Sequence, residues 1–366
     1  MALLFMDGFD HYDTSASNVS AQMLGSGDYV SSSGMERTSE TAYGDGLGSA
    51  LVFNDDSSYW QTKSLPIAGN RVIIGFHVRR TSQQSSNNAT AWQRLVGINN
   101  HFNLSMNMSK PNRVYAKRGS FNYQGIELGG AGDYFTLEQN VTHHIVCIVD
   151  QSTSATGRVQ VYKDGIKVID IQNVATVSAH NANVNIIAGQ VQSSNYWERL
   201  AYDNLFVMDG GGAENNDYPG ILRVLPLLPN GDDAIAAGAT ALNGGSHFEE
   251  VDDEFLNGAD STYTSTATAG DQNLYDVPVA STLWADADQV IALQVKQNVG
   301  TNAPTNSEIA AVINDGTNTA QGDTHTATTV AHKLFSHIFD AAPDGGAWDL
   351  ATLDALKVGH KHISSS

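Results

Sequence analysis

Short runs in which apolar and polar residues alternate fill the first 210 residues of the chain. Within residues 71–80, for example, Val72, Ile74, Phe76 and Val78 fall on one side of such a run. Alternation with a period of two is typical of a β-strand with one buried face. Ten or more such runs follow one another, separated by turn-forming residues, and no helical period is sustained over 12 residues. The pattern predicts a large antiparallel β-sandwich.

The clearest local signal lies in residues 159–171. Alternating apolar residues stand on both sides of the dipeptide Asp164-Gly165. An Asp-Gly pair in this setting favours a two-residue turn between antiparallel strands, because both turn positions need a positive φ. The sequence therefore predicts a β-hairpin here.

The second half of the chain has fewer and longer elements. Residues 288–299 alternate over a long stretch, which predicts a strand buried mainly on one face. Further strands are predicted at 308–315 and 332–341. A smaller β-sandwich fits this pattern.

One short helix is predicted near residue 350. Asp349 is suited to cap its N-terminus, and Gly359 is suited to end it before a final short strand. Apolar residues at helical spacing lie between them: Leu350, Leu353 and Leu356. The predicted fold class is all-β, a jelly-roll sandwich followed by a smaller sandwich with this one helix.

A segment with three prolines, 218–231, separates the two patterns. We predict a first domain over 1–217, an extended connector over 218–231, and a small acidic β-sandwich over 232–366. The connector is too apolar for a flexible linker. We expect its apolar residues to form docking or assembly contacts, namely Leu225, Leu227, Leu228 and Pro229.

Charge supports the same division. The chain carries a net charge of −20, of which residues 1–223 contribute −5 (20 acidic, 15 basic) and residues 224–366 contribute −15 (19 acidic, 4 basic). A balance this acidic argues against a nucleic-acid partner, whose phosphates need basic side chains. No run of about 18 apolar residues predicts a membrane span, and the start lacks the basic segment of a secretory signal. Folding in a cytoplasm is therefore expected, with Cys147 packed as a small apolar residue.

The first half resembles the laminin-G/concanavalin-A-like family. The runs that carry the resemblance are "HHIVCIVD", "GRVQVYKDGIKV" and "AYDNLFVMDG". In that family the last of these forms a terminal strand beside the first strand of the chain. The resemblance implies a jelly-roll sandwich over about residues 1–210 and says little about activity.

The chain as a whole resembles structural proteins of tailed bacteriophages, in which a concanavalin-A-like module precedes a small C-terminal module. The match is carried by Leu228 to Gly231, Val251-Asp252, Tyr263, Trp348 and Leu356 to Gly359. It implies a non-enzymatic virion protein of the tail, fibre or surface decoration, assembled in the host cytoplasm. The expected partners are further copies of the chain and other virion proteins, and a host surface glycan if the first domain binds one.

Two alternatives stay open beside that reading. In the first, the chain is an adhesin whose first domain recognises a glycan through aromatic rings and neighbouring amides. The residues expected to bind it are Trp92, Tyr123 and Trp197. In the second, the chain is a glycoside hydrolase that uses Glu250, Asp252 and Glu254, because carboxylates at this spacing share one face of a strand. The alternate position Asp253 is charged rather than apolar, which favours a solvated loop instead.

Calcium is the one cofactor that the residues suggest. Proteins of the lectin-like family often hold it with Asp and Asn oxygens, and such oxygens are its usual ligands. The candidate ligands are Asp7 and Asp10 on the first strand and Asp203 and Asn204 on the strand expected beside it.

Overall fold

The structure is a computed structural model, and the residues that it describes are 2–10, 12, 16–38, 50–53, 58–83, 92–107, 110, 113–119, 125–189, 198–211, 217–241, 243–251, 263–283, 289–301, 306–327 and 333–365. The fold is all-β, as predicted. The chain divides into two compact units, the first made of residues 1–24 and 28–225 and the second of 25–27 and 226–366. The division between Leu225 and Pro226 falls inside the segment predicted as a connector. None of the helices in the described residues is long and apolar enough to cross a membrane.

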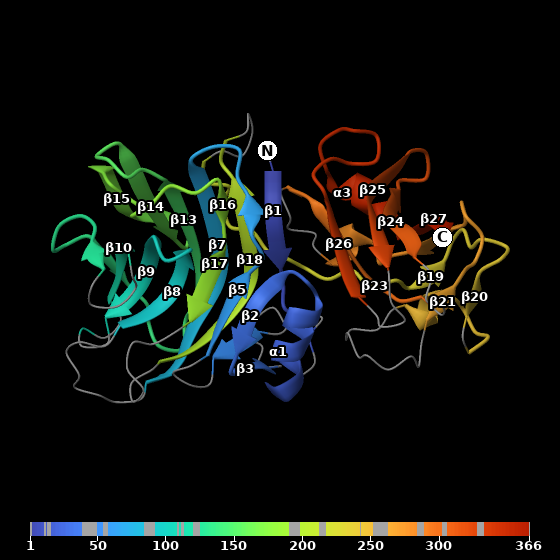
Figure 1. The fold of residues 1–366 in the computed structure, drawn as a ribbon, viewed down its shortest axis with the longest axis horizontal. Helices are drawn as coiled ribbons and strands as arrows, with labels where there is room; N and C mark the ends of the chain where they lie inside the picture. Colours follow the sequence, from blue (N-terminus) through green and yellow to red (C-terminus); the bar gives the residue numbers. More distant parts are fainter. Residues whose placement is uncertain are drawn as a thin grey trace. The chain divides into compact units, whose positions relative to one another are not determined.

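The first unit is a sandwich of two eight-stranded antiparallel sheets (Figure 1). We call the first of them the front sheet. Its strands run in the order β15 (Ile166–Val174), β14 (Gly157–Lys163), β13 (Thr142–Asp150), β7 (Arg71–Gln83), β18 (Glu198–Asp209), β4 (Ala50–Phe53) and β3 (Met35–Thr38), with β1 (Ala2–Asp7) also paired to β18.

We call the second sheet the back sheet. Its strands run in the order β11 (Ile126–Glu127), β10 (Arg113–Arg118), β9 (Phe102–Asn107), β8 (Trp92–Ile98), β17 (Ile186–Gly189), β5 (Tyr59–Thr62) and β2 (Tyr29–Ser33), with β12 (Tyr134–Thr136) also paired to β10. A separate two-stranded ladder joins β6 (Leu65–Pro66) to β16 (Asn183–Val184).

The core lies between the two sheets. Alternate residues of each strand point into it, so Val72, Ile74, Phe76 and Val78 are buried there as their spacing predicts. Tyr202 crosses the core, and its hydroxyl donates to the carbonyl of Leu95 on the other sheet, at 3.0 Å. Each large apolar side chain taken from water into such a core contributes roughly 1.5–3 kcal/mol.

Two local predictions are confirmed in the first unit. Asp164 and Gly165 form the two-residue turn between β14 and β15, and both have positive φ, at 52° and 82°. Strand β1 also pairs with β18 in antiparallel register, with Phe5 opposite Val207. The terminal strands therefore lie side by side, as the resemblance to the lectin-like family implies.

The second unit is built on a five-stranded antiparallel sheet in the order β19, β22, β27, β24 and β25 (Figure 1). The bounds of its strands are β19 (Gly231–Asp232), β20 (Thr240–Ala241), β21 (Thr264–Ser265), β22 (Gln272–Asp276), β23 (Leu293–Val299), β24 (Ser307–Asn314), β25 (Thr319–Ala327), β26 (Lys333–Phe339) and β27 (Lys357–Ser365). Strands β23 and β26 pair with each other, as do β20 and β21. A small core of its own is centred on Ile313, Phe339, Trp348 and Leu353.

The described residues contain more helix than predicted. Helix α3 (Leu350–Asp354) begins at the predicted cap, where Asp349 accepts a hydrogen bond from the Thr352 amide at 2.7 Å. The second unit also holds α2 (Ala280–Leu283) and the 3₁₀ turn η1 (Phe248–Glu250), and the first unit holds α1 (Ala16–Gly25). In α1, Val19 and Met23 lie one helical turn apart and are both buried. This helix is only 10 residues long, so a search for a helical period over 12 residues misses it.

Two boundary predictions are wrong. Gly359 does not end a helix, because α3 stops at Asp354 and Gly359 lies inside β27. A Cβ at Gly359 would stand 1.8 Å from the carbonyl oxygen of Asn273 on β22, so the glycine is required by close strand approach. The strand predicted from residue 288 begins only at Leu293.

Candidate functional site

The outer surface of the back sheet carries polar side chains where three of its strands run side by side. Along β10, Val114 and Ala116 point into the core, so Tyr115 and Lys117 lie on the opposite face. The cross-strand register places Ser105 and Arg94 in one row with Tyr115, and Asn103 and Gly97 in one row with Lys117. We call this set the polar face, and it comprises Trp92, Arg94, Asn103, Ser105, Asn107, Tyr115 and Lys117.

Aromatic rings and cations are interleaved on the polar face. The Lys117 Nζ lies 3.7 Å from the centroid of the Trp92 ring, which is within the range of a cation–π contact. The Trp92 ring meets Tyr115 edge to face at 5.7 Å, and Tyr115 lies 5.5 Å from Tyr134 on β12. At the end of this row the guanidinium of Arg113 stands 4.3 Å over Tyr134, and both of these side chains are half-buried.

The two cations in the interior of the polar face are unusually well buried. Lys117 and Arg94 are each 1% exposed. Burial lowers the pKa of Lys117 to about 8, and the nearby Glu127 carboxylate opposes that shift. Burial also lowers the pKa of Arg94 to about 10, and its Nη2 donates to Asn100 Oδ1 at 2.9 Å. Positive charge has thus been placed in a low-dielectric site.

Some polar atoms of the polar face are fully buried without a hydrogen-bond partner among the residues that the structure describes. They include Ser105 Oγ and Asn103 Oδ1. The Asn103 amide nitrogen does donate, to the Gly119 carbonyl at 2.5 Å. Its oxygen lies close above Gly97, where a Cβ would stand 2.3 Å from it. An unpaired buried polar atom costs about 1–3 kcal/mol, so these two are suited to contact a polar ligand.

The sequence analysis found only part of this site. Trp92 was predicted to bind a glycan and lies on the polar face, whereas Tyr123 and Trp197 lie outside the described residues. Lys117, Arg94 and Ser105 were missed. A signal for Lys117 and Ser105 existed in "RVYAKR" and "FNLSMN", where polar residues take every second position of a strand. Only the strand pairing shows that these positions share one row.

The residues suggested for calcium have other bonds in the structure. The buried Asp7 accepts hydrogen bonds from the Phe9 amide at 2.8 Å and from the Tyr12 and Tyr29 hydroxyls at 2.9 and 2.8 Å. Burial of Tyr29, and next to it the negative charge of Asp7, raise the pKa of Tyr29 well above the ordinary tyrosine value. Asp10 also has a bonding partner. Asp7 therefore ties the start of the chain to β2.

The other two suggested ligands lie on β18. Asp203 stands opposite His77 of β7, and its Oδ1 accepts the Asn204 amide at 2.6 Å. The Asn204 Oδ1 accepts the Val224 amide at 2.5 Å. No group of three or more His, Cys, Asp or Glu side chains in the described part of the chain is arranged to hold a metal ion. Calcium binding stays a prediction from the sequence.

The carboxylate run at residues 250–254 is not a strand where the structure describes it. Glu250 ends the η1 turn and is buried. Its two oxygens accept hydrogen bonds from the backbone and side-chain amides of Asn243 at 2.9 and 3.0 Å. Asp252 and Glu254 lie outside the described residues. Glu250 therefore holds a loop, and its oxygens are occupied in doing so.

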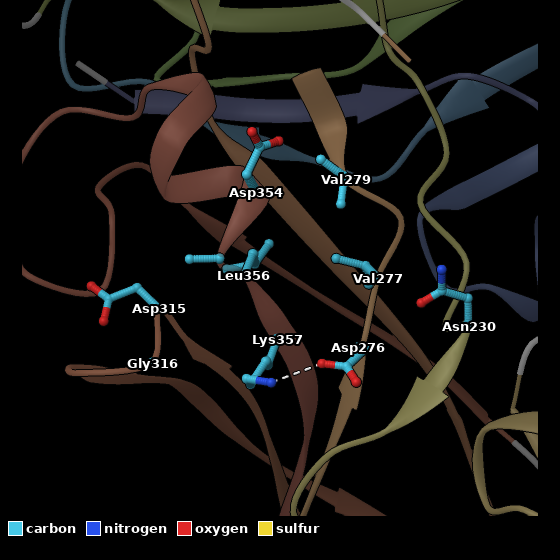
Figure 2. A pocket seen from close by; sticks show the side chains of 10 residues that line it. Asn230, Asp276, Val277, Val279, Asp315, Gly316, Asp354, Leu356 and Lys357 are labelled. Carbon is cyan, nitrogen blue, oxygen red and sulfur yellow. Dashed lines mark hydrogen bonds and ion pairs between the residues drawn. The ribbon is translucent and has the colours of Figure 1, made fainter. Parts of the chain in front are cut away.

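A shallow pocket of about 510 Å³ lies in the second unit (Figure 2). Lys357, one of its lining residues, bonds Asp276 at 2.7 Å, and the Asp354 carboxylate accepts the Ser281 amide at 2.8 Å. Asp315 accepts the amides of its own turn, from Thr317 and Asn318. Each carboxylate that lines this pocket is thus bonded within the protein, and the polar face is the stronger candidate site.

The connector residues are placed on both sides of the division between the units. Leu225 is half-buried and ends the first unit, whereas Leu227 packs against the core of the second. Leu228 is exposed and Pro229 half-buried. Their role in assembly stays a prediction.

Comparison with known proteins gives a likeness of fold. No protein-family model matches the chain. No curated protein matches it either. Similar solved structures include alginate lyase Aly36B with a bound alginate tetrasaccharide (12% identity, 56% of this chain and 96% of that one, TM-score 0.40), the marine PL-14 alginate lyase from Aplysia kurodai (11%, 57% and 100%, 0.39) and the endo-β-1,4-glucuronan lyase from Trichoderma reesei (14%, 48% and 86%, 0.35).

These neighbours correct one expectation. The chain was predicted to be a structural virion protein without enzymatic activity, but the neighbours are polysaccharide lyases and none of them is a phage protein. We therefore set that prediction aside. At these identities the likeness is one of fold, so the function of this chain has to be argued from its own polar face. A location in a virion stays a prediction that these comparisons do not test.

Proposed function

We propose that this chain binds an acidic polysaccharide on the polar face of its first unit and cleaves it there. The observation that carries the proposal is the burial of Lys117 and Arg94 among aromatic rings and unpaired polar atoms, in a chain whose net charge is −20. A sugar acid offers a carboxylate to the cations, hydroxyls to Ser105 and Asn103, and an apolar ring face to the aromatic row.

The partly exposed end of the aromatic row gives the ligand a way to approach. Arg113 and Tyr134 are half-buried. The side chains farther along the row are buried: Trp92, Tyr115 and Lys117 are 6%, 3% and 1% exposed. A polysaccharide that meets Arg113 first would place its next sugars toward Tyr115 and Lys117. The half-buried Arg113 thus selects for negative charge at the outer end of the row.

The residue types suit cleavage by β-elimination of a uronate. Arg94 would hold the carboxylate, and Lys117, whose pKa is lowered to about 8, would in its neutral form accept the proton from the carbon beside that carboxylate. The Tyr115 hydroxyl would donate a proton to the glycosidic oxygen as its bond to carbon breaks. The product carries a new carbon–carbon double bond, and the step consumes no water and no cofactor.

The test is to replace Lys117 with methionine, which keeps the apolar stem over Trp92 and removes the charge. Lys110→Met, at an exposed lysine, is the matched control. Alginate and polyglucuronate are offered beside a neutral β-glucan, with binding measured by calorimetry and cleavage by the ultraviolet absorbance of the unsaturated product. We expect Lys117→Met to reduce cleavage by roughly 100-fold or more, as loss of a general base does, and Lys110→Met to leave it unchanged.

The pH profile gives a second readout of the same variant. Because Lys117 must be neutral to accept a proton, cleavage by the wild-type protein should rise as the pH increases toward 8 and level off above it. The proposal fails if neither acidic polysaccharide binds, or if Lys117→Met binds and cleaves as the wild type does.

A further inference from the structure

A second cluster lies on the front sheet, away from the polar face and outside the proposed function. Residues 217–225, which form no helix or strand, run over the outer surface of this sheet, and we call them the strap. Tyr218 of the strap stacks on Tyr162 of β14, with ring centroids 4.1 Å apart and planes 12° apart. Farther along, the Val224 amide donates to Asn204 of β18 at 2.5 Å. The strap is therefore held at both ends.

A histidine holds the middle of the strap. The Leu222 amide donates to Nε2 of His144 on β13 at 3.4 Å. An imidazole nitrogen can accept a hydrogen bond only when it carries no proton, so this contact requires neutral His144 with its proton on Nδ1. The Nδ1 atom is buried and has no hydrogen-bond partner among the described residues. A doubly protonated ring would lose the bond to Leu222 and gain none.

A second histidine disfavours a positive charge on His144. The ring centroids of His77 on β7 and His144 lie 4.7 Å apart, and the Phe206 ring stacks with His144 at 6.3 Å. The strap adds the cation of Arg223. Asp164, in the turn between β14 and β15, opposes it, and Asp203 faces His77 in the register of β18 with β7. His143 points to the other side of β13, where it bonds Glu138 and Asp164.

The titration of the pair follows from this arrangement. Burial lowers the pKa of His77 to about 4, with Arg223 adding to the shift. Burial lowers the pKa of His144 to about 3, with His77 adding and Asp164 opposing. When the strap is detached from the sheet, the pKa of each histidine returns toward the ordinary value near 6.5. The stability that the neutral histidines give the closed strap is therefore fully present above pH 6.5 and is lost as the pH falls toward 4 for His77 and toward 3 for His144.

We propose that the strap is an acid-released latch, in which protonation of His77 and His144 detaches residues 217–225 from the front sheet while the sandwich stays folded. The consequence is regulatory: acid would uncover the outer face of the front sheet and free the segment that links the two units. Between pH 7 and pH 5 the ratio of closed to open strap should fall roughly 20-fold for each histidine.

The experiment is hydrogen exchange of the whole chain, read by mass spectrometry at pH 7, 6 and 5 and corrected for the intrinsic pH dependence of exchange. The peptide that contains the Leu222 and Val224 amides should lose protection by 20-fold or more, while peptides from β7 and β13 keep theirs. The proposal is overturned if the strap peptide keeps its protection at pH 5, or if β7 and β13 lose theirs together with it.

Variants separate the histidine pair from other acid effects. The double variant His77→Gln, His144→Gln leaves neutral amides that can still accept the Leu222 bond, so its strap should stay protected at pH 5. His180→Gln, at an exposed loop histidine, should behave as the wild type. If the double variant does not fold, Arg223→Gln serves instead: removing this cation should move the release to lower pH, and an unchanged midpoint would overturn the proposal.

Discussion

The role of a single buried polar residue in this protein is set by the hydrogen-bond partners around it. Asp7 is the best example, because it was selected from the sequence as a metal ligand and is instead the acceptor for two tyrosine hydroxyls and a backbone amide. A carboxylate that is 1% exposed needs such donors, since burying its charge without them is costly. The same chemistry that attracts calcium thus also serves to fasten β1 to β2.

Replacing Tyr29 with phenylalanine tests that role. The variant removes one of the donors to Asp7, and we expect it to lower the free energy of unfolding by about 1–3 kcal/mol, as for other buried groups that lose a partner. Denaturant titration measures the effect. Tyr59→Phe, at a half-buried tyrosine of the neighbouring strand β5, is the control and should change stability little. Equal effects of the two substitutions would contradict this role for Asp7.

At the scale of elements, the local sequence predicted strands and their turns better than it predicted boundaries. The hairpin of β14 and β15 and the cap of α3 follow from interactions within a few residues, and both are confirmed. The prediction for Gly359 was wrong because the contact that requires a glycine there is not local in the sequence. Its neighbour Asn273 is 86 positions away in the sequence and touches it only once β22 and β27 have paired.

Gly359→Ala is therefore expected to damage the second unit. A methyl group 1.8 Å from the Asn273 carbonyl must push the two central strands apart, which should cost about 1–3 kcal/mol or more. Thermal unfolding followed by circular dichroism measures the loss. Gly245→Ala is the matched control, because its nearest atom is the movable Glu249 carboxylate at 3.1 Å. A Gly359→Ala protein as stable as the control would show that these strands do not pair as described.

At the scale of the whole molecule, the negative net charge opposes the approach of an acidic polysaccharide. The chain has a net charge of −20, so a polyanion is repelled at long range even though Lys117 and Arg94 would attract it at the site. Salt at about 0.15 M limits that repulsion to roughly 8 Å. It screens the two buried cations much less, because they lie away from water.

We therefore expect the association rate of an acidic polysaccharide to increase when salt is raised from about 0.01 M to about 0.15 M. Surface plasmon resonance with immobilised polyglucuronate measures this rate. A neutral glucan serves as the control and should show no such increase. An association rate that falls steeply with added salt would instead mean that exposed basic residues, and not the polar face, capture the polymer.

The sequence by itself determined the fold class and most of the strands, because alternation along a strand and turn chemistry are properties of neighbouring residues. It also singled out Trp92. Only the tertiary structure decided that Arg94, Ser105 and Tyr115 form one row, that Lys117 lies over Trp92, and that Leu222 meets His144. Those contacts join positions on different strands, and the register of strand pairing, which local sequence leaves open, sets them.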